Sequence, residues 1–273
     1  MSATAQRDVP TSTGEVAVQR SEGSAMSKSS FPWHARPGLA GGIDKDGTRA
    51  AELLGLGFGS VEFGTVAVGP RAGAELAALR ARLAALPARA PGAAAIGIGL
   101  GQPADAAPRA LAACWIAGLY GAWDVADYLS FNLSARACAP LLAPARLPLV
   151  EAALRAVAAA RAGLPRRVPL ALKFRLGGAN WANEAPPAVA LAAAAAGFDL
   201  LTAVLPDDDP KRLSRLHALI TAVSDGPAVV AVGGIRKASD VAEVRASGAA
   251  GVQVHRAFSE SGATCLAQLL GSA

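Results

Sequence analysis

The sequence is poor in several residues on which specialised functions depend. Among its 273 residues there are 3 cysteines and 3 histidines, and aromatic side chains make up only 5%. Cys114, Cys138 and Cys265 lie far apart and form no CxxC pair, which excludes a disulfide framework and a zinc site and favours a reducing, cytoplasmic compartment. Because aromatics are scarce and the arginines are scattered, we expect no nucleic-acid surface. We also expect no metal site, because His255 is a lone histidine without a second ligand.

Long apolar runs are also missing. The longest ones are interrupted by glycine, proline or charge well before the roughly 20 residues that span a bilayer, so we expect no membrane segment. Residues 1–30 contain serine, threonine, glycine and alternating charges without apolar periodicity, which predicts a disordered N-terminal extension. Met26 stays open as an alternative start. Residues 31–273 are expected to form a single domain.

Apolar residues are abundant, at 52% of the chain, which is enough for one large core. From Pro37 onward, short β-type runs alternate with longer alanine-rich runs, a pattern typical of parallel strands with crossover helices. The strand candidates are residues 38–43, 60–66, 94–100, 127–134, 169–174, 198–205, 228–234 and 251–257. The helix candidates are residues 48–54, 75–86, 108–119, 149–162, 188–196, 212–223 and 239–246, with a closing helix after Ser261. This alternation predicts an α/β fold, a single (β/α)8 TIM barrel.

Lysines mark candidate site positions, because the chain has only Lys28, Lys45, Lys173, Lys211 and Lys237. In such a barrel the chemistry lies at the C-terminal ends of the strands, where Lys45 and Lys173 are expected. A lysine in the barrel mouth is costly unless it meets an anion or a developing negative charge. The alternative is a structural ion pair with Asp44 or Glu62.

Other expected strand ends also carry polar or glycine residues. Asn132 lies in the strand-like run YLSFNLS, where asparagine is disfavoured unless it meets a hydrogen-bonding need. Gly233-Gly234 lies where many barrels bind a ligand phosphate on backbone N–H groups, with a plain turn as the alternative. His255 and Arg256 follow the eighth strand. The run of three aspartates at 207–209 predicts a solvated loop rather than a cation site.

Several segments together resemble the dihydroorotate dehydrogenase family of FMN-dependent TIM barrels. They are GLAGGIDKDG (38–47), LGFGSVEFGTV (56–66), LSFNLS (129–134), VPLALKF (168–174) and VVAVGGIRKASDVAEVRASGAAGVQV (229–254). They occur in the family's order between residues 37 and 257. The resemblance implies that the chain uses FMN.

The resemblance also implies roles for individual residues. Lys45 would contact flavin and the acid group of the substrate, Asn132 would bridge cofactor and substrate, and Lys173 would face the pyrimidine edge of the flavin. The remaining cofactor residues would line the flavin (Ala40, Gly41, Gly42, Gly64 and Thr65) or hold its phosphate (Gly233, Gly234, His255 and Arg256).

Three positions depart from the family pattern. Ala135 stands where the family has its Ser or Cys catalytic base, Gly99 stands where it has an asparagine, and Leu205 lies where its sixth strand ends in Thr-Asn-Thr. Without hydrogen bonds worth roughly 1–3 kcal/mol each, recognition of orotate is lost. Ser134 or Cys138 are candidates for a replacement proton acceptor.

These observations favour an FMN-binding oxidoreductase that acts on a small anionic substrate other than dihydroorotate. Three alternatives stay open: a flavin-free enzyme using Lys45 and Lys173, a non-catalytic barrel that binds a partner protein, and dihydroorotate oxidation with a rearranged base. The oligomeric state is also open, and a homodimer is one option.

Overall fold

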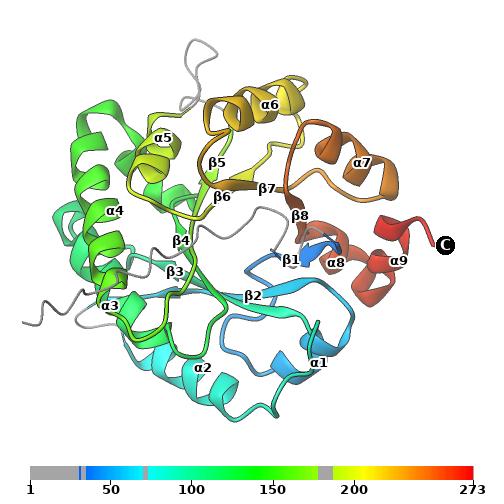
Figure 1. Ribbon diagram of the computed structural model, residues 1–273, viewed down its shortest axis with the longest axis horizontal. Coiled ribbons are helices and arrows are strands. Elements are labelled where there is room, and N and C mark those ends of the chain that lie inside the picture. The colour runs from blue at the N-terminus through cyan, green and yellow to red at the C-terminus, as the bar shows by residue number, and fades with distance from the viewer. Residues whose placement is uncertain (1–30, 32–34, 70–72, 178–186, 273) are drawn as a thin grey trace, which may run out of the picture.

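A computed structural model describes residues 31, 35–69, 73–177 and 187–272. The expected N-terminal extension, residues 1–30, lies outside these described residues. Eight parallel strands close into a barrel in chain order, and helices surround it, as Figure 1 shows. The predicted TIM barrel is therefore confirmed.

The strands are short and connect through helices on the outside of the barrel. The strands are β1 (Gly38–Leu39), β2 (Ser60–Ala67), β3 (Ala95–Gly101), β4 (Tyr128–Asn132), β5 (Leu170–Arg175), β6 (Leu200–Val204), β7 (Ala228–Val232) and β8 (Gly251–Val254). The helices are α1 (Ala50–Gly55), α2 (Ala74–Ala84), α3 (Leu111–Ala122), α4 (Leu147–Ala162), α5 (Ala188–Ala195), α6 (Arg212–Ala222), α7 (Ala238–Ala246), α8 (Arg256–Ser261) and α9 (Cys265–Leu270). Short 3₁₀ turns are η3 (Pro108–Ala110), η4 (Arg136–Leu142), η5 (Pro144–Arg146) and η8 (Gly262–Thr264).

The first strand is much shorter than the predicted 38–43 and ends at Leu39. The Asp44 carboxylate accepts hydrogen bonds from the backbone N–H groups of Gly47 and Arg49, both at 2.9 Å. These bonds turn the chain toward α1, because a carboxylate at this point satisfies N–H groups that precede a helix.

The last strand also ends early, at Val254 instead of residue 257. The chain turns at once into α8, in which the N–H of Ser259 donates to the His255 carbonyl at 3.0 Å. Sequence reasoning missed this helix. Arg256 is therefore the first residue of a helix rather than the end of a strand.

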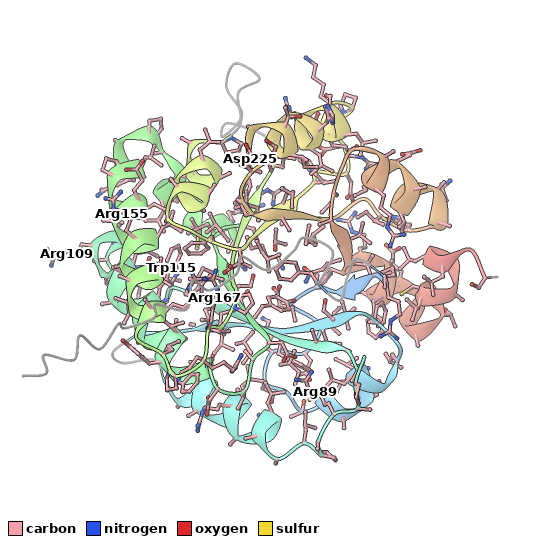
Figure 2. The ribbon with its side chains drawn as sticks, in the orientation of Figure 1. Arg89, Arg109, Trp115, Arg155, Arg167 and Asp225 are labelled. Carbon is pink, nitrogen blue, oxygen red and sulfur yellow. The ribbon has the colours of Figure 1, made fainter. Side chains whose placement is uncertain are left out.

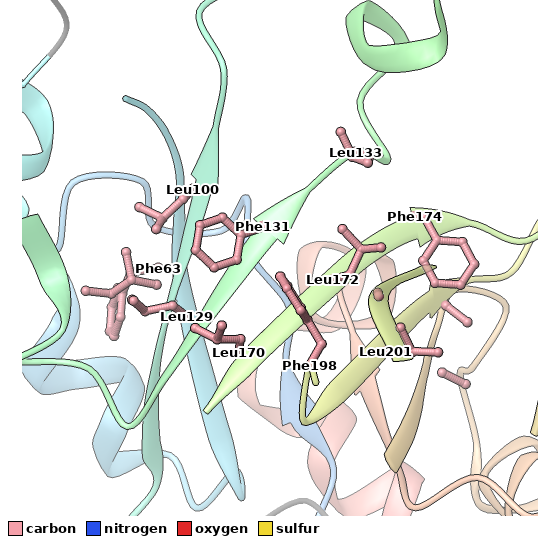
Figure 3. Close-up of a cluster of buried hydrophobic side chains, with 14 of the residues drawn as sticks. Phe63, Leu100, Leu129, Phe131, Leu133, Leu170, Leu172, Phe174, Phe198 and Leu201 are labelled. Carbon is pink, nitrogen blue, oxygen red and sulfur yellow. The ribbon is translucent and has the colours of Figure 1, made fainter. Parts of the chain in front are cut away.

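The main core lies between the strands and the helices. Phe131 of β4 is fully buried, with its ring 5.1 Å from that of Trp115 in α3 and 5.9 Å from that of Phe198. Figure 3 shows Phe131 and Phe198 among the leucines of β4, β5 and β6. Several arginines lie at the periphery, and Figure 2 shows Arg109 and Arg155 at the outer rim of the helical layer. The basic charge is thus spread over the surface.

No single helix within the described ranges is long and apolar enough to span a membrane. One bent pair, Arg136–Leu142 with Pro144–Ala162, satisfies the length and composition criteria, and its two parts meet at 78°. The apolar residues of α4, including Val150, Leu154 and Val157, are buried in the core of the barrel, which accounts for their hydrophobicity.

Candidate active site

A buried ion pair lies at the centre of the barrel mouth. Lys173 of β5 donates from Nζ to Oε1 of Glu62 on β2 at 3.0 Å, and the two side chains are only 7% and 0% exposed. The two strands are not neighbours in the barrel, so the pair spans its interior. Of the two carboxylates considered from sequence, Glu62 is the partner of Lys173, while Asp44 bonds to backbone N–H groups of its own loop.

The second oxygen of Glu62 has no partner. Oε2 is buried and makes no hydrogen bond in the described part of the chain. Glycines make room for this carboxylate, because a Cβ on Gly41 would lie 2.7 Å from Oε1 and a Cβ on Gly99 would lie 3.4 Å from it. A buried acceptor without a partner calls for a donor from water or a ligand. The described chain therefore leaves one buried hydrogen-bond acceptor of the barrel mouth unsatisfied.

Asn132 is fixed beside this pair by three hydrogen bonds. Its Nδ2 donates to Thr65 Oγ1 at 2.7 Å, and its Oδ1 accepts from the N–H and hydroxyl of Ser134 at 2.8 and 2.7 Å. Asn132 and Lys173 are register partners on β4 and β5. The structure thus brings together Thr65, Asn132, Ser134 and Lys173.

The Cys138 thiol lies below Asn132. Its Sγ donates to the Asn132 carbonyl oxygen at 3.7 Å, and burial raises the pKa of the thiol. A raised pKa keeps the sulfur protonated near neutral pH. Cys138 therefore presents a hydrogen-bond donor to the Asn132 carbonyl, and its role as a replacement proton acceptor stays a prediction.

Backbone atoms of the loop after β1 form one wall of the mouth. The N–H of Ala40 donates to the Val254 carbonyl at 2.8 Å, and that of Gly42 donates to the Gly64 carbonyl at 2.6 Å. Gly64 has a φ of +99°, and a Cβ there would lie 2.6 Å from the Gly99 carbonyl oxygen. These contacts require glycine and leave a bare backbone surface between β1 and β2.

Lys45 stands apart from the buried pair. Its side chain is exposed, and it makes no ion pair or hydrogen bond with the rest of the described chain. An exposed ammonium on the mouth side of the barrel is free to meet an anion from solution.

A pocket of about 430 Å³ lies over the ends of β5 to β8. Gly233 and Gly234 line it with φ angles of +96° and +66°. A Cβ on Gly233 would lie 2.6 Å from the Leu205 carbonyl oxygen, so this glycine is required by the local backbone as well. Arg256 also lines the pocket and pairs with Asp207.

His255 separates this pocket from a second one of about 520 Å³, which Gly42 and Phe258 also line. The imidazole Nε2 lies 3.0 Å from the place that a Cβ on Gly42 would take. Desolvation lowers the pKa of His255, and the nearby Lys173 and Arg256 cations lower it further. The imidazole is therefore neutral near neutral pH.

Sequence reasoning assigned no ligand-site role to two groups that the structure places in the site. Glu62 was considered only as a structural partner, although an acid within the apolar run VEFGTV marks an inward-facing position. Asp207 was assigned to a solvated loop; it is exposed, but it also lines the pocket beside Arg256.

Comparison with models of known protein families finds no match. Among curated proteins, the chain is 30% identical over 292 residues to dihydroorotate dehydrogenase (quinone) from Kineococcus radiotolerans, covering 86% of this chain and 77% of that protein. Among solved structures, DHODH from Eimeria tenella in complex with ferulenol has a TM-score of 0.71 at 18% identity, over 88% of this chain and 80% of that one. The ligand-free type from the same organism gives 0.70 at 17% identity, over 86% and 82%.

Proposed function

The chain belongs to the dihydroorotate dehydrogenase family, and from that premise we propose that it is an FMN-binding oxidoreductase acting on a small anionic substrate other than dihydroorotate. Membership in this family implies oxidoreductase chemistry. The observation that carries the finer proposal is the buried Lys173 ammonium, fixed by Glu62 in the barrel mouth. A cation held at this depth suits a cofactor that gains negative charge on reduction.

The residues of the mouth fit FMN in three respects. The flat ring needs bare backbone, which the glycines at 41, 64 and 99 provide because they carry no side chain. Its pyrimidine edge needs hydrogen-bonding groups, which Lys173 and the neighbouring Asn132 offer. Its phosphate needs N–H groups and cations, which the turn at Gly233 and Gly234 and the side chain of Arg256 supply.

Each residue then has a definite task. FMN, when bound, supplies two-electron chemistry. Lys173 stabilises negative charge in a position largely shielded from water, and Asn132 holds its amide in one orientation through Thr65 and Ser134. The exposed Lys45 binds the acid group of the substrate.

The proposal of another substrate rests on the rebuilt part of the site. Ala135 carries no acid–base group, Gly99 has no side chain, and Leu205 at the end of β6 is a buried hydrocarbon. A site without these hydrogen bonds discriminates poorly in favour of a pyrimidine. Ser134 and Cys138 are the hydroxyl and the thiol beside Asn132, and we propose that one of them acts as the proton acceptor.

The test is an absorption spectrum of the freshly purified protein, followed by fluorescence titration of flavin-free protein with FMN. We expect oxidised-flavin bands, or saturable uptake of added FMN, and weaker binding by Lys173→Ala. Arg155→Ala on the outer face of α4 is the matched control, since it removes the same charge far from the mouth. A colourless protein that takes up no FMN contradicts the proposal.

A second measurement separates the cofactor from the substrate. Dihydroorotate is added anaerobically to the flavin-loaded protein, and the flavin absorbance is followed. We expect no reduction on the timescale of turnover. Rapid bleaching by dihydroorotate would leave the flavin assignment intact and overturn the assignment of a different substrate.

A further inference from the structure

A carboxylate of the chain itself lies at the phosphate end of the site. Arg256 donates from Nη1 to Oδ2 of Asp207, which follows β6. The other oxygen, Oδ1, lies 3.5 Å from the place that a Cβ on Gly234 would take, and Arg212 Nη1 lies against the same place. Asp207 therefore brings a negative charge to the glycine turn that a ligand phosphate would use.

An anion from solution can replace Asp207 as the partner of Arg256. The side chains of Arg256 and Asp207 are 61% and 36% exposed, and pairs this exposed hold together weakly because water competes for both partners. An anion from solution can thus take the place of the carboxylate without opening the barrel.

The surrounding charge favours such an exchange. Arg175 also lines the pocket and makes no ion pair with the described part of the chain. Arg236, a third lining arginine, pairs with Glu260 at 3.0 Å. If Asp207 moves away, the pocket keeps a surplus of guanidinium groups around the Gly233–Gly234 turn.

We propose that Asp207 is an internal competitor of the ligand phosphate: it neutralises Arg256 when no ligand is bound and must be displaced when a phosphomonoester binds. This inference rests on the proposed flavin function. It makes Asp207 a specificity-determining residue, because it weakens the binding of a phosphorylated flavin and leaves the binding of an unphosphorylated one unchanged.

The test compares the affinities of FMN and riboflavin by fluorescence titration in the wild type, Asp207→Asn and Asp208→Asn. Asp208 is the matched control, since it is the next residue, lines the same pocket and forms no ion pair in the described chain. Both variants remove one negative charge. We expect Asp207→Asn to bind FMN about 3- to 10-fold more tightly, with riboflavin changed by less than about twofold, and Asp208→Asn to change both by less than about twofold.

A double-mutant cycle with Arg256→Gln ties the effect to the ion pair. In the Arg256→Gln background, Asp207→Asn should give no further gain in FMN affinity, because the competing contact is already absent. A persisting gain would overturn the proposal.

The remaining outcomes are also decisive. Equal gains in Asp207→Asn and Asp208→Asn would show a long-range charge effect and overturn the inference. Weaker FMN binding by Asp207→Asn would make the carboxylate a support for Arg256 and overturn it too. If the wild type binds both flavins and Asp207→Asn changes neither, the inference alone fails, whereas a wild type that binds neither flavin overturns the proposed function together with it.

Discussion

At the scale of single residues, burial of the charged Lys173–Glu62 pair costs stability, which points to a function for the pair. Two charges withdrawn from water lose several kcal/mol each of hydration, and their mutual attraction offsets this only with good geometry. The pair has one hydrogen bond of 3.0 Å, yet Glu62 Oε2 stays without a partner. A pair kept for stability alone would satisfy that oxygen within the chain, so the unsatisfied buried oxygen costs stability that a structural role does not explain.

Removing only one side chain of the Lys173–Glu62 pair should therefore lower the free energy of unfolding more than removing both. Lys173→Met leaves the Glu62 carboxylate buried and unpaired, and we expect the free energy of unfolding to fall by about 3–5 kcal/mol. The double variant Glu62→Leu with Lys173→Met should recover most of this loss. Urea denaturation measures both. Equal losses in the single and double variants would contradict a pairing role for Glu62.

His255 predicts a pH dependence of stability. Its pKa is lowered in the folded protein by desolvation and by the Lys173 and Arg256 cations, so the unfolded chain binds this proton more readily. The ordinary pKa of histidine is about 6.5. Neutral His255 therefore contributes fully to the free energy of unfolding above about pH 6.5, and this contribution is lost as the pH falls below that value. His255→Gln should lose less stability than the wild type between about pH 6.5 and 5.5, as measured by urea denaturation at each pH. Parallel curves for the two proteins would contradict this assignment.

At the scale of elements, the two glycines of the turn after β7 are confined by their neighbours to different degrees. A Cβ on Gly233 would meet the Leu205 carbonyl oxygen at 2.6 Å, whereas a Cβ on Gly234 would meet the mobile end of Arg212. Both residues have positive φ angles, but only the first is closed in by rigid backbone. The two glycines should therefore respond differently to substitution.

We expect Gly233→Ala to lower the free energy of unfolding by about 3 kcal/mol and Gly234→Ala by about 1 kcal/mol, since a left-handed alanine alone costs about 1–2 kcal/mol. Urea denaturation of the two variants measures the difference. A loss for Gly234→Ala as large as that for Gly233→Ala would show that Arg212 cannot move aside.

Element boundaries show what a local pattern can predict. The alternation of strand and helix was sufficient to predict the barrel, because it depends on periodicity within each segment. The predicted ends of β1 and β8 were wrong. After β1, Asp44 binds N–H groups ahead of α1 and turns the chain away, and after β8 the helix α8 begins directly. Such endings depend on side-chain contacts that apolar periodicity does not encode.

The site was predictable to a similar extent. Lys173 and Asn132 stand out because their residue types are rare in this chain and fall at strand ends. The pairings of Lys173 with Glu62 and of Arg256 with Asp207 join segments that meet only when the barrel closes. Spacing along the chain left Glu62 as one of two possible partners of Lys173 and gave no sign that Asp207 pairs with Arg256.

At the scale of the whole molecule, the barrel has a polar mouth and an apolar floor. A small separate cluster at the N-terminal ends of the strands contains Tyr128, Leu200 and Val230, and Phe31 packs into it with 5% of its surface exposed. Barrels of this kind place stability at this end and chemistry at the other. Phe31 therefore plugs the barrel at the end away from the ligand.

Phe31→Ala should thus separate stability from ligand binding. We expect the free energy of unfolding to fall by about 3 kcal/mol, as for other buried aromatic truncations, with the FMN affinity of the folded protein unchanged because the mouth keeps all its contacts. Tyr120→Ala is the control, since that side chain is 54% exposed and should cost little. Urea denaturation and fluorescence titration measure the two quantities on the same samples. A loss of FMN affinity in Phe31→Ala under conditions in which the protein is fully folded would show that the floor and the mouth are coupled through the polar interior of the barrel.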